Sequence, residues 1–412
     1  MRHIAKKLSA SEQQESSESI LGAVPPANNV GRPPLSHVAL LFLRLGFTAF
    51  GGPAAHIAMM EDEVVRRRHW LTRERFLDLL GAANLIPGPS STEMAIYIGY
   101  TQAGWRGIVL GGACFILPAA LITLALAWAY VRFGRLPQIT GLLYGVKPVV
   151  IAIIVQAIWN LRRAAIKNRI QLAVGILALV AAAVTGRTLS VLIGAGLLMC
   201  LVLTIRAGRP LGTVVSGFLP APFSLPKLFA VVPAAAIASV SLLSLFLVFF
   251  KVGAVVFGSG YVLLAFLKAY LVDQRHWLTN TQLLDAVAVG QVTPGPVFTT
   301  ATFIGYVLAG LPGAGLATLG IFLPGFLLVA VSGPLIPWLR RSSYAGRFLD
   351  GVNVAALALI SVVTWQLGRA SIRDWPTLGL AVLSAVLLLR FRLNSVWLIA
   401  IGATAGLLLA KS

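Results

Sequence analysis

Two Pro-Gly-Pro motifs interrupt apolar stretches of the chain, and neutral hydrogen-bonding side chains surround both. Residues 84–93 read Asn-Leu-Ile-Pro-Gly-Pro-Ser-Ser-Thr-Glu, and residues 291–300 read Gln-Val-Thr-Pro-Gly-Pro-Val-Phe-Thr-Thr. Proline lacks the backbone donor that continues a helix, so each motif predicts two half-helices that meet at a break. Free N–H groups at the start of the second half-helix would form a positive end suited to an anion. The candidate substrate-binding residues at the breaks are Asn84, Pro87, Gly88, Pro89, Gln291, Pro294, Gly295 and Pro296.

A structural kink would explain one isolated motif of this kind. Two breaks at matching positions of two repeats instead favour a transport site, because discontinuous helices bind the substrate in many carriers. Irregular backbone at membrane depth is tolerated only where protein or a water-filled cavity lines it.

Arg44 and Lys251 occupy equivalent positions of two similar halves, each inside an apolar helix shortly before a Phe-Gly motif. A cation buried in a membrane helix is costly and usually faces a partner or a pathway. One charge from each half would then converge on a dianion. Gly51, Gly52 and Gly258, at the Phe-Gly breaks, are further candidate substrate-binding residues. Snorkelling of both side chains to the lipid headgroups explains the two positions equally well.

Glu93 lies in an apolar stretch beside the first break, and the second half has no acid at that position. It is a candidate to carry the proton of a coupled transporter, because desolvation favours the neutral carboxyl; the alternative is a counter-ion for Arg44. Lys147 is a weaker candidate, since the second half has an asparagine in its place. Asp78 and Asp285 match each other, and we expect each to pair with a loop arginine such as Arg75.

The segment His69-Trp70-Leu71-Thr72 recurs at residues 276–279, and a structural role accounts for it. Tryptophan anchors helices at the headgroup level, and Thr279 with Gln282 has the spacing of a capping box. The two cysteines, Cys114 and Cys200, are expected to be small packing residues. No metal site or cofactor is predicted, and no zinc-peptidase motif, phosphate-binding loop or carboxylate pair supports an enzyme.

Membrane helices must position these residues. Of the 412 residues, 58% are hydrophobic and 11% are charged, against roughly 45–50% and about 25% in soluble proteins. A span needs ~20 apolar residues, so the composition predicts an all-α polytopic protein in the lipid bilayer, with roughly ten to twelve spans. The net charge of +20 lies mostly between apolar runs, where the positive-inside rule explains it without nucleic-acid binding.

The chain consists of two tandem copies of one unit. The recurrence at residues 276–279, the two Phe-Gly motifs and the two Pro-Gly-Pro motifs share an offset of 207 residues, which becomes 206 downstream. This divides the chain into a polar tail (1–36), a first repeat (37–205), a Pro-rich linker (206–243) and a second repeat (244–412). Each repeat is expected to begin with a helix that contains the Phe-Gly break, at 37–58 and 244–265. The later apolar runs are 106–131, 140–160, 170–186 and 188–205, with partners at 312–337, 347–366, 376–389 and 394–410, and linker residues 228–240 are apolar enough to extend the next helix.

The lysines and arginines of the loops predict that the two copies face opposite ways. Their number alternates from loop to loop within each copy, and the pattern reverses between copies. Inverted-topology repeats have this charge pattern. For the copies to be inverted, each must span the membrane an odd number of times. About five spans per copy meet this condition if the Pro-Gly-Pro segment enters the membrane and returns to the same side. Five spans per copy would place the N-terminal tail outside the cell, whereas its basic residues mildly favour the inside.

The Phe-Gly-Gly motif at residues 50–52, the paired Pro-Gly-Pro motifs and the run Gln-Val-Thr-Pro-Gly-Pro-Val-Phe-Thr-Thr-Ala-Thr-Phe-Ile-Gly-Tyr at 291–306 resemble the chromate ion transporter family. The resemblance is to its long, two-domain form and covers residues 37–412. It implies a bacterial inner-membrane protein that exports chromate and confers resistance, driven by proton exchange. One departure is that Ser259-Gly260 follows Phe257-Gly258, where the family has Gly-Pro.

The residues alone lead to a carrier for a small inorganic oxyanion. Alternating access of two repeats around a central site is the favoured mechanism, and a homodimer is an open option. The alternatives are an importer of sulfate or another small anion, a passive anion channel and, least favoured, a membrane-embedded chromate reductase. Chromate and sulfate are similar tetrahedral dianions, so hydrogen-bond geometry alone discriminates them poorly.

Overall fold

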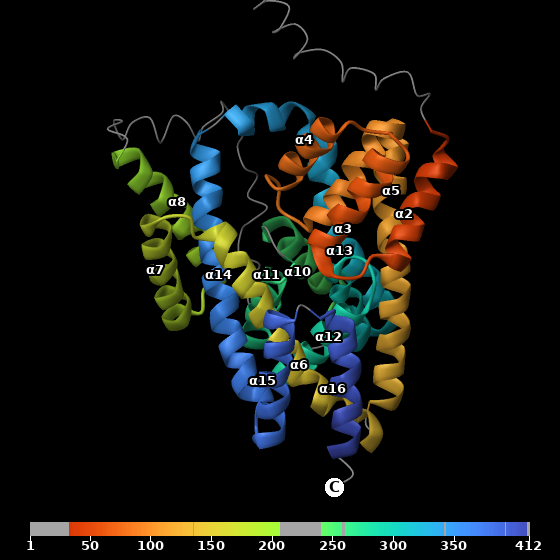
Figure 1. The fold of residues 1–412 in the computed structure, drawn as a ribbon, viewed down its shortest axis with the longest axis vertical. Coiled ribbons are helices and arrows are strands. Elements are labelled where there is room, and N and C mark those ends of the chain that lie inside the picture. Colours follow the sequence, from red (N-terminus) through yellow and green to blue (C-terminus); the bar gives the residue numbers. More distant parts are fainter. Residues whose placement is uncertain are drawn as a thin grey trace, which may run out of the picture.

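The computed structural model describes residues 33–134, 136–206, 240–257, 260–341, 343–391 and 393–409, and the described chain is helical without β-strands (Figure 1). Most of the tail 1–36, most of the linker 206–243, including all of its apolar segment 228–240 except residue 240, and Gly258 lie outside the described residues. The all-α class expected from the composition is therefore confirmed for the described part of the chain.

The two repeats contain the same order of elements, except that the second has an additional 3-10 turn before its longest helix. The first contains α2 (Leu35–Thr48), α3 (Gly52–Glu61), the π-helical η1 (Asp62–Arg67), α4 (Arg73–Ala83), α5 (Ser90–Phe133), α6 (Pro137–Ala165), α7 (Arg169–Thr185) and α8 (Thr188–Arg206). The second contains α10 (Leu242–Val255), α11 (Val262–Leu267), the π-helical η3 (Lys268–Gln274), α12 (Asn280–Val292), the 3-10 turn η4 (Val297–Thr299), α13 (Thr300–Arg341), α14 (Ser343–Ser371), α15 (Trp375–Arg390) and α16 (Ser395–Leu409).

Several of these helices are suited to a bilayer. Within the described residues, five are long and apolar enough to cross a membrane: Ser90–Phe133, Pro137–Ala165, Thr188–Arg206, Val297–Ser332 and Tyr344–Ser371. Large apolar side chains point outward on many of them; Trp105 and Trp128 on α5 are 65% and 54% exposed. Exposure of this kind is expected where lipid covers the surface, so the chain is a multi-pass membrane protein.

The long helices α5 and α13 are folded hairpins. A straight helix of 44 residues would measure about 66 Å, roughly twice the hydrocarbon thickness. Ala103 and Gly104 have non-helical dihedral angles, and the backbones of Gly99 and Gly107 lie so close that neither position has room for a Cβ. The helix therefore reverses at residues 103–104, and α13 does the same at residues 309–310.

Glycine contacts join the two repeats in a reciprocal manner. Gly145 on α6 packs against Gly402 and Gly406 on α16, while Gly351 on α14, its equivalent in the second repeat, packs against Gly196 on α8. In Figure 1 these two contact regions lie at different ends of the molecule, with α7 and α8 beside the upper part of α14 and with α15 and α16 beside the lower end of α6. Each repeat thus holds the final helices of the other.

Polar contacts reinforce this exchange of helices. The Tyr144 hydroxyl on α6 donates to Asp374 Oδ2 over 2.7 Å, and Asp374 also caps α15 by accepting from Thr377 N. The Thr377 backbone donor, followed by Tyr144, holds the pKa of the Asp374 carboxyl below its ordinary value.

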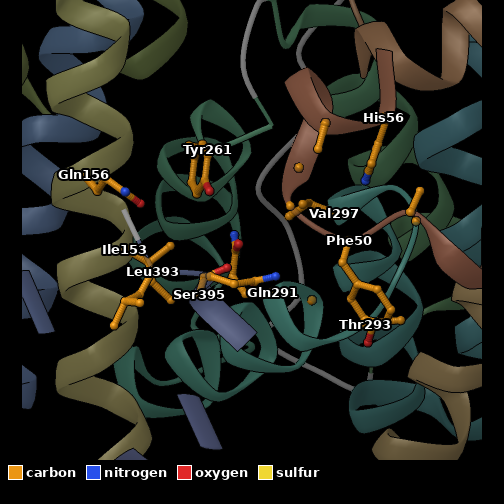
Figure 2. Close-up of a pocket in the computed structure, with 17 residues that line it drawn as sticks. Phe50, His56, Ile153, Gln156, Tyr261, Gln291, Thr293, Val297, Leu393 and Ser395 are labelled. Carbon is orange, nitrogen blue, oxygen red and sulfur yellow. The ribbon is translucent and has the colours of Figure 1, made fainter. Parts of the chain in front are cut away.

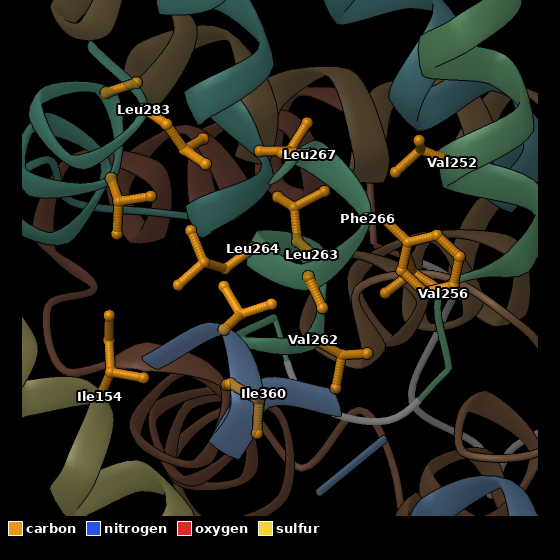
Figure 3. Close-up of a cluster of buried hydrophobic side chains, with 14 of the residues drawn as sticks. Ile154, Val252, Val256, Val262, Leu263, Leu264, Phe266, Leu267, Leu283 and Ile360 are labelled. Carbon is orange, nitrogen blue, oxygen red and sulfur yellow. The ribbon is translucent and has the colours of Figure 1, made fainter. Parts of the chain in front are cut away.

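The largest apolar core surrounds α11 and fixes the second Phe-Gly break. All six residues of α11 are buried, including Leu263, Leu264 and Phe266, and Figure 3 shows these side chains among Val252 and Ile360 of the neighbouring helices. A short helix that is apolar on all sides is stable only inside a packed interior. The core therefore holds the backbone before and after this break in place.

The repeated His-Trp-Leu-Thr segment is structural. Thr279 and Gln282 form the predicted capping box at the start of α12, and Thr72 accepts from Arg75 N at the start of α4. The headgroup role predicted for Trp70 is wrong: its side chain is only 8% exposed, and the Arg68 guanidinium lies 5.2 Å from its ring centroid. The chain turns with a φ of +52° at both His69 and His276, but Trp277 is only half-buried, so the burial of Trp70 comes from its tertiary packing.

Candidate functional site

The four predicted breaks meet in pairs at the centre of the molecule. Gly88 N of the first Pro-Gly-Pro motif donates to Val256 O, which follows α10, over 2.7 Å. Gly295 N of the second motif donates to Ala49 O, which follows α2, over 2.8 Å. These two bonds are equivalent under the offset of 207 residues. Each repeat therefore supplies the donor for the other's Phe-Gly break, and we call the two junctions the first and second crossing, after the Pro-Gly-Pro motif in each.

Glycine is required at both crossings. Gly88 has φ of +137° and Gly295 has φ of +88°, and L-residues rarely adopt positive φ. A Cβ on Gly295 would lie 2.8 Å from the Ala119 Cβ and 3.3 Å from the carbonyl of Gly46. A Cβ on Gly88 would overlap the carboxyl of Glu93. Both crossings thus depend on a missing side chain as well as on backbone freedom.

A cavity of about 350 Å³ lies beside the second crossing, between the two repeats. Figure 2 shows His56, Phe50 and Val297 on one side, Gln156, Ile153 and Leu393 on the other, and Tyr261 and Gln291 between them. The predicted residues Gly51, Gly52, Gln291 and Gly295 are among those that line it. The lining residues that were not among the predicted substrate-binding residues include Phe50, His56, Gln156, Tyr261, Asn394 and Ser395.

The cavity is rich in neutral donors. Helix α3 begins at Gly52 and α16 at Ser395, so two helix N-termini border the same space. The buried His56 Nδ1 has no hydrogen-bond partner among the described residues, and the Gln291 side chain lies within hydrogen-bonding reach of the Tyr261 hydroxyl. Helix N-termini and free donors stabilise anions.

Hydroxyl groups support the second crossing. Thr123 Oγ1 lies 3.4 Å from Thr293 Oγ1 and 3.3 Å from Thr299 Oγ1, so α5 of the first repeat contacts both sides of the second break.

The predicted residues of the two breaks differ in burial. Asn84 is exposed at the end of α4, and Pro87 is half-buried. Pro89, Pro294 and Pro296 are buried.

The two matched cations are not part of the described cavity lining, which contains no Asp, Glu, Lys or Arg. Arg44 is 59% exposed and its Nη1 lies 3.5 Å from Glu63 Oε1, in a second hollow that also contains Arg67. Lys251 Nζ lies 4.8 Å from the ring centroid of Tyr270. The structure therefore gives each cation a partner within its own repeat.

Glu93 is completely buried, and neither carboxyl oxygen has a hydrogen-bond partner among the described residues. It lies between Gly88 of the first crossing and Gly325 on α13, whose Cβ position is 3.9 Å from Oε1. The alternative role as counter-ion of Arg44 is wrong, because Arg44 pairs with Glu63 instead.

Asp285 takes part in a buried ion pair between the repeats. Lys147 Nζ on α6 lies 3.3 Å from Asp285 Oδ1 on α12, with the two side chains 18% and 2% exposed. The Tyr130 hydroxyl on α5 donates to Asp285 Oδ2 over 3.0 Å. The expected pairing of Asp285 with a loop arginine is wrong, because the helix exchange brings α6 against α12. At the equivalent positions the second repeat has Asn353 and Ile336, so this cluster occurs once.

Comparison with known proteins places this geometry in context. A family model described as "Chromate transporter" matches residues 36–203 and 243–407. A "Chromate transport protein" of Cupriavidus metallidurans is 38% identical over 90% of this chain and 91% of its own. A "Probable chromate transport protein" of Synechococcus elongatus is 35% identical over 91% and 95%, and a "Chromate transport protein" of Pseudomonas aeruginosa is 32% identical over 91% and 92%. No solved structure gave a significant match.

Proposed function

Because the chain belongs to the chromate transporter family, we propose that it exports chromate across a bacterial inner membrane by alternating access. An inorganic oxyanion as substrate and a multi-pass membrane protein as carrier follow from the family and from the apolar helices. The relatives are named as transport proteins, which agrees with a carrier and not with an enzyme.

The observation that carries the proposal is the pair of crossings beside a polar cavity. Four helix breaks meet there through Gly88–Val256 and Gly295–Ala49 hydrogen bonds, and the polar side chains of His56, Gln156 and Gln291 line the adjacent space. Broken helices in an otherwise regular membrane protein are kept where backbone groups bind a substrate. An oxyanion can accept hydrogen bonds from these groups in place of water, and no covalent bond has to form.

The exchange of helices supports movement of the two repeats against each other. The contact of α6 with α16 and that of α14 with α8 lie at different ends of the molecule in Figure 1. Inverted repeats related by an axis in the membrane plane would give this arrangement. In the proposed cycle the contacts of one end open while those of the other close, with the crossings between them as pivots.

Two sets of groups are available to bind the anion. The cavity supplies neutral donors from both repeats, whereas Arg44 and Lys251 supply charge but have partners within their own repeats. We favour the cavity, because its polar side chains come from both repeats and are already arranged around one space. The two cations then act on the approach of the anion to the membrane surface, where charge raises the local concentration of the substrate.

Export is tested in a chromate-sensitive bacterial host. Cells that produce the chain are expected to accumulate several-fold less labelled chromate than cells with an empty vector, and to grow at chromate concentrations that stop the control. Increased accumulation, together with growth on limiting sulfate, would instead identify an importer. A conductance that does not saturate would identify a channel.

Glu93 is the proposed proton carrier. An unpaired carboxylate is far less stable in a buried site than the neutral acid, so proton release has to accompany a movement that opens the region between Gly88 and Gly325. Glu93→Gln is expected to abolish the stimulation of chromate transport by a pH gradient, while exchange of chromate without a gradient continues. Transport by Glu93→Gln that follows the gradient as in the wild type would rule Glu93 out.

A further inference from the structure

We infer that the turn between α6 and α7 binds the phosphate of an anionic phospholipid through Arg162, Arg163 and Arg169. The first two arginines lie in the last turn of α6, and the third is the first residue of α7. Basic groups at a membrane surface recognise negatively charged headgroups. This ligand is a component of the bilayer and not the transported anion, so the site goes beyond the proposed function.

The positive charge at this turn is not neutralised within the described chain. None of the three arginines forms an ion pair with an acidic residue that the structure describes. The neighbouring Lys167 has a distant partner, since its Nζ lies 3.9 Å from Asp350 Oδ1. The sequence explains the excess, because no Asp or Glu occurs between Glu93 and Asp273. Three cationic side chains are therefore available to an anion from outside the protein.

Arg162 is held in place by an aromatic ring. Its guanidinium carbon lies 3.5 Å from the ring centroid of Trp159, which precedes it by about one turn of α6. Its buried Nε has no hydrogen-bond partner among the described residues. A guanidinium stacked on a ring keeps its N–H donors at the edge, and their planar fork matches two oxygens of a phosphate. The geometry therefore prepares Arg162 for a phosphate before the ligand arrives.

Arg169 occupies a position where a cation is unfavourable. The N-terminus of a helix carries the equivalent of about half a positive charge, and the first turn of α7 contains no acid. The capping side chains are already used: Gln171 N donates to Asn168 Oδ1 over 2.9 Å, and Lys167 N donates to Gln171 Oε1 over 2.6 Å. A bound anion would relieve the repulsion between Arg169 and the helix end.

Apolar side chains that face the lipid lead away from the arginines. On α6, Val155 and Trp159 are exposed and share a helix face with Arg163, at intervals of four residues. On α7, Leu172 and Ile176 are exposed and continue the face that begins with the arginine at its start. Figure 1 shows α7 at the edge of the molecule, against α14. Acyl chains can therefore contact these side chains while the phosphate lies at the turn, and a tryptophan at headgroup level fits the same placement.

The equivalent turn of the second repeat offers an internal comparison. Two of the three arginines have uncharged equivalents there, Gly368 and Trp375, and Asp374 adds a negative charge. The basic residues that remain are Arg369 and Arg373. The positive-inside rule accounts for basic residues in a loop of either kind, whereas a stacked and unpaired arginine cluster occurs at the first of these two turns. We therefore expect the α6–α7 turn to bind the phospholipid more tightly.

Titration of the purified, delipidated full-length protein with phosphatidylglycerol, read out by native mass spectrometry, tests the site. Each basic residue near a charged lipid surface contributes roughly fivefold in affinity. We therefore expect Arg162→Gln/Arg163→Gln to bind the first phosphatidylglycerol at least tenfold more weakly than the wild type. Arg369→Gln/Arg373→Gln removes the same number of charges at the equivalent turn and should bind within twofold of the wild type. The neutral phosphatidylcholine should bind all three proteins equally weakly.

Thermal unfolding checks that the variants are folded, and Arg163→Gln alone, which changes one exposed side chain, replaces the double variant if that one does not fold. Its expected loss is about fivefold. Wild-type affinity in Arg162→Gln/Arg163→Gln and in Arg163→Gln, or an equal loss in Arg369→Gln/Arg373→Gln, would overturn the assignment. Displacement of phosphatidylglycerol by an equal concentration of inorganic phosphate would show a site for free anions and would also overturn it. None of these results depends on whether the chain transports chromate.

Discussion

Replacing Gly295 with alanine is expected to reduce chromate transport at least tenfold. The substitution forces an L-residue to a φ of +88°, which costs about 1–3 kcal/mol. It also places a methyl group 2.8 Å from the Ala119 Cβ and 3.3 Å from the Gly46 carbonyl, so the backbone must shift. The bond from Gly295 N to Ala49 O is then lost, and the wall of the cavity moves with it. The measurement is the initial rate of chromate uptake into everted vesicles, normalised to the amount of folded protein.

Gly315→Ala is the matched control for this prediction. Gly315 lies on α13, the helix that follows the second Pro-Gly-Pro motif, has no positive φ, and has no heavy atom within 4 Å of its Cβ position. Its substitution should leave the rate within twofold of the wild type. If Gly295→Ala transports as well as Gly315→Ala, the second crossing is not part of the route.

Removing either partner of the Lys147–Asp285 pair is expected to destabilise the protein strongly. Loss of one member of a buried ion pair typically costs about 3–5 kcal/mol, because the other charge stays buried without a partner. Lys147→Met and Asp285→Asn should each lower the unfolding temperature in detergent by roughly 5–15 °C. The double variant Lys147→Met/Asp285→Leu should regain at least half of the loss, since it leaves no isolated charge.

An exposed pair between the same repeats supplies the control. Lys167 Nζ lies 3.9 Å from Asp350 Oδ1, with side chains 63% and 38% exposed, and exposed pairs contribute only about 0–1 kcal/mol. Lys167→Met is therefore expected to shift the unfolding temperature by no more than about 3 °C. An equal shift in Lys147→Met would show that Asp285 does not join the two repeats in the way described.

Much of the fold follows from local properties of the sequence. The repeat, the apolar runs and the positions of the breaks all depend on residue type and spacing, so α6, α7, α8 and their partners lie close to the expected ranges. The capping box at Thr279 is equally local. The Phe-Gly and Pro-Gly-Pro motifs interrupt the helices where they were expected to, so the ends of α2, α4, α10 and α12 could be placed. Pro118 and Pro148, in contrast, lie inside α5 and α6.

The contacts between repeats could not be read in the same way. The residue type alone suggested that Trp70 is a headgroup anchor. Its burial depends on how α4 packs against the rest of the protein, which the residue itself does not reveal. Asp285 pairs with Lys147 because the helices exchange between repeats, and the cavity that His56 lines is completed by Tyr261 and Gln291, more than 200 positions away. A comparison of the two copies offered one signal: His56 and Leu263, or Tyr261 and Ala54, differ in polarity at equivalent positions.

Uptake of labelled chromate into everted membrane vesicles tests the central claim most directly. An outward carrier in the cell transports into such vesicles, so we predict uptake that saturates with chromate concentration, rises when an acidic interior is imposed, and is lost in Gly295→Ala but not in Gly315→Ala. Absence of uptake with and without a pH gradient, in vesicles that contain the folded protein, would contradict the account.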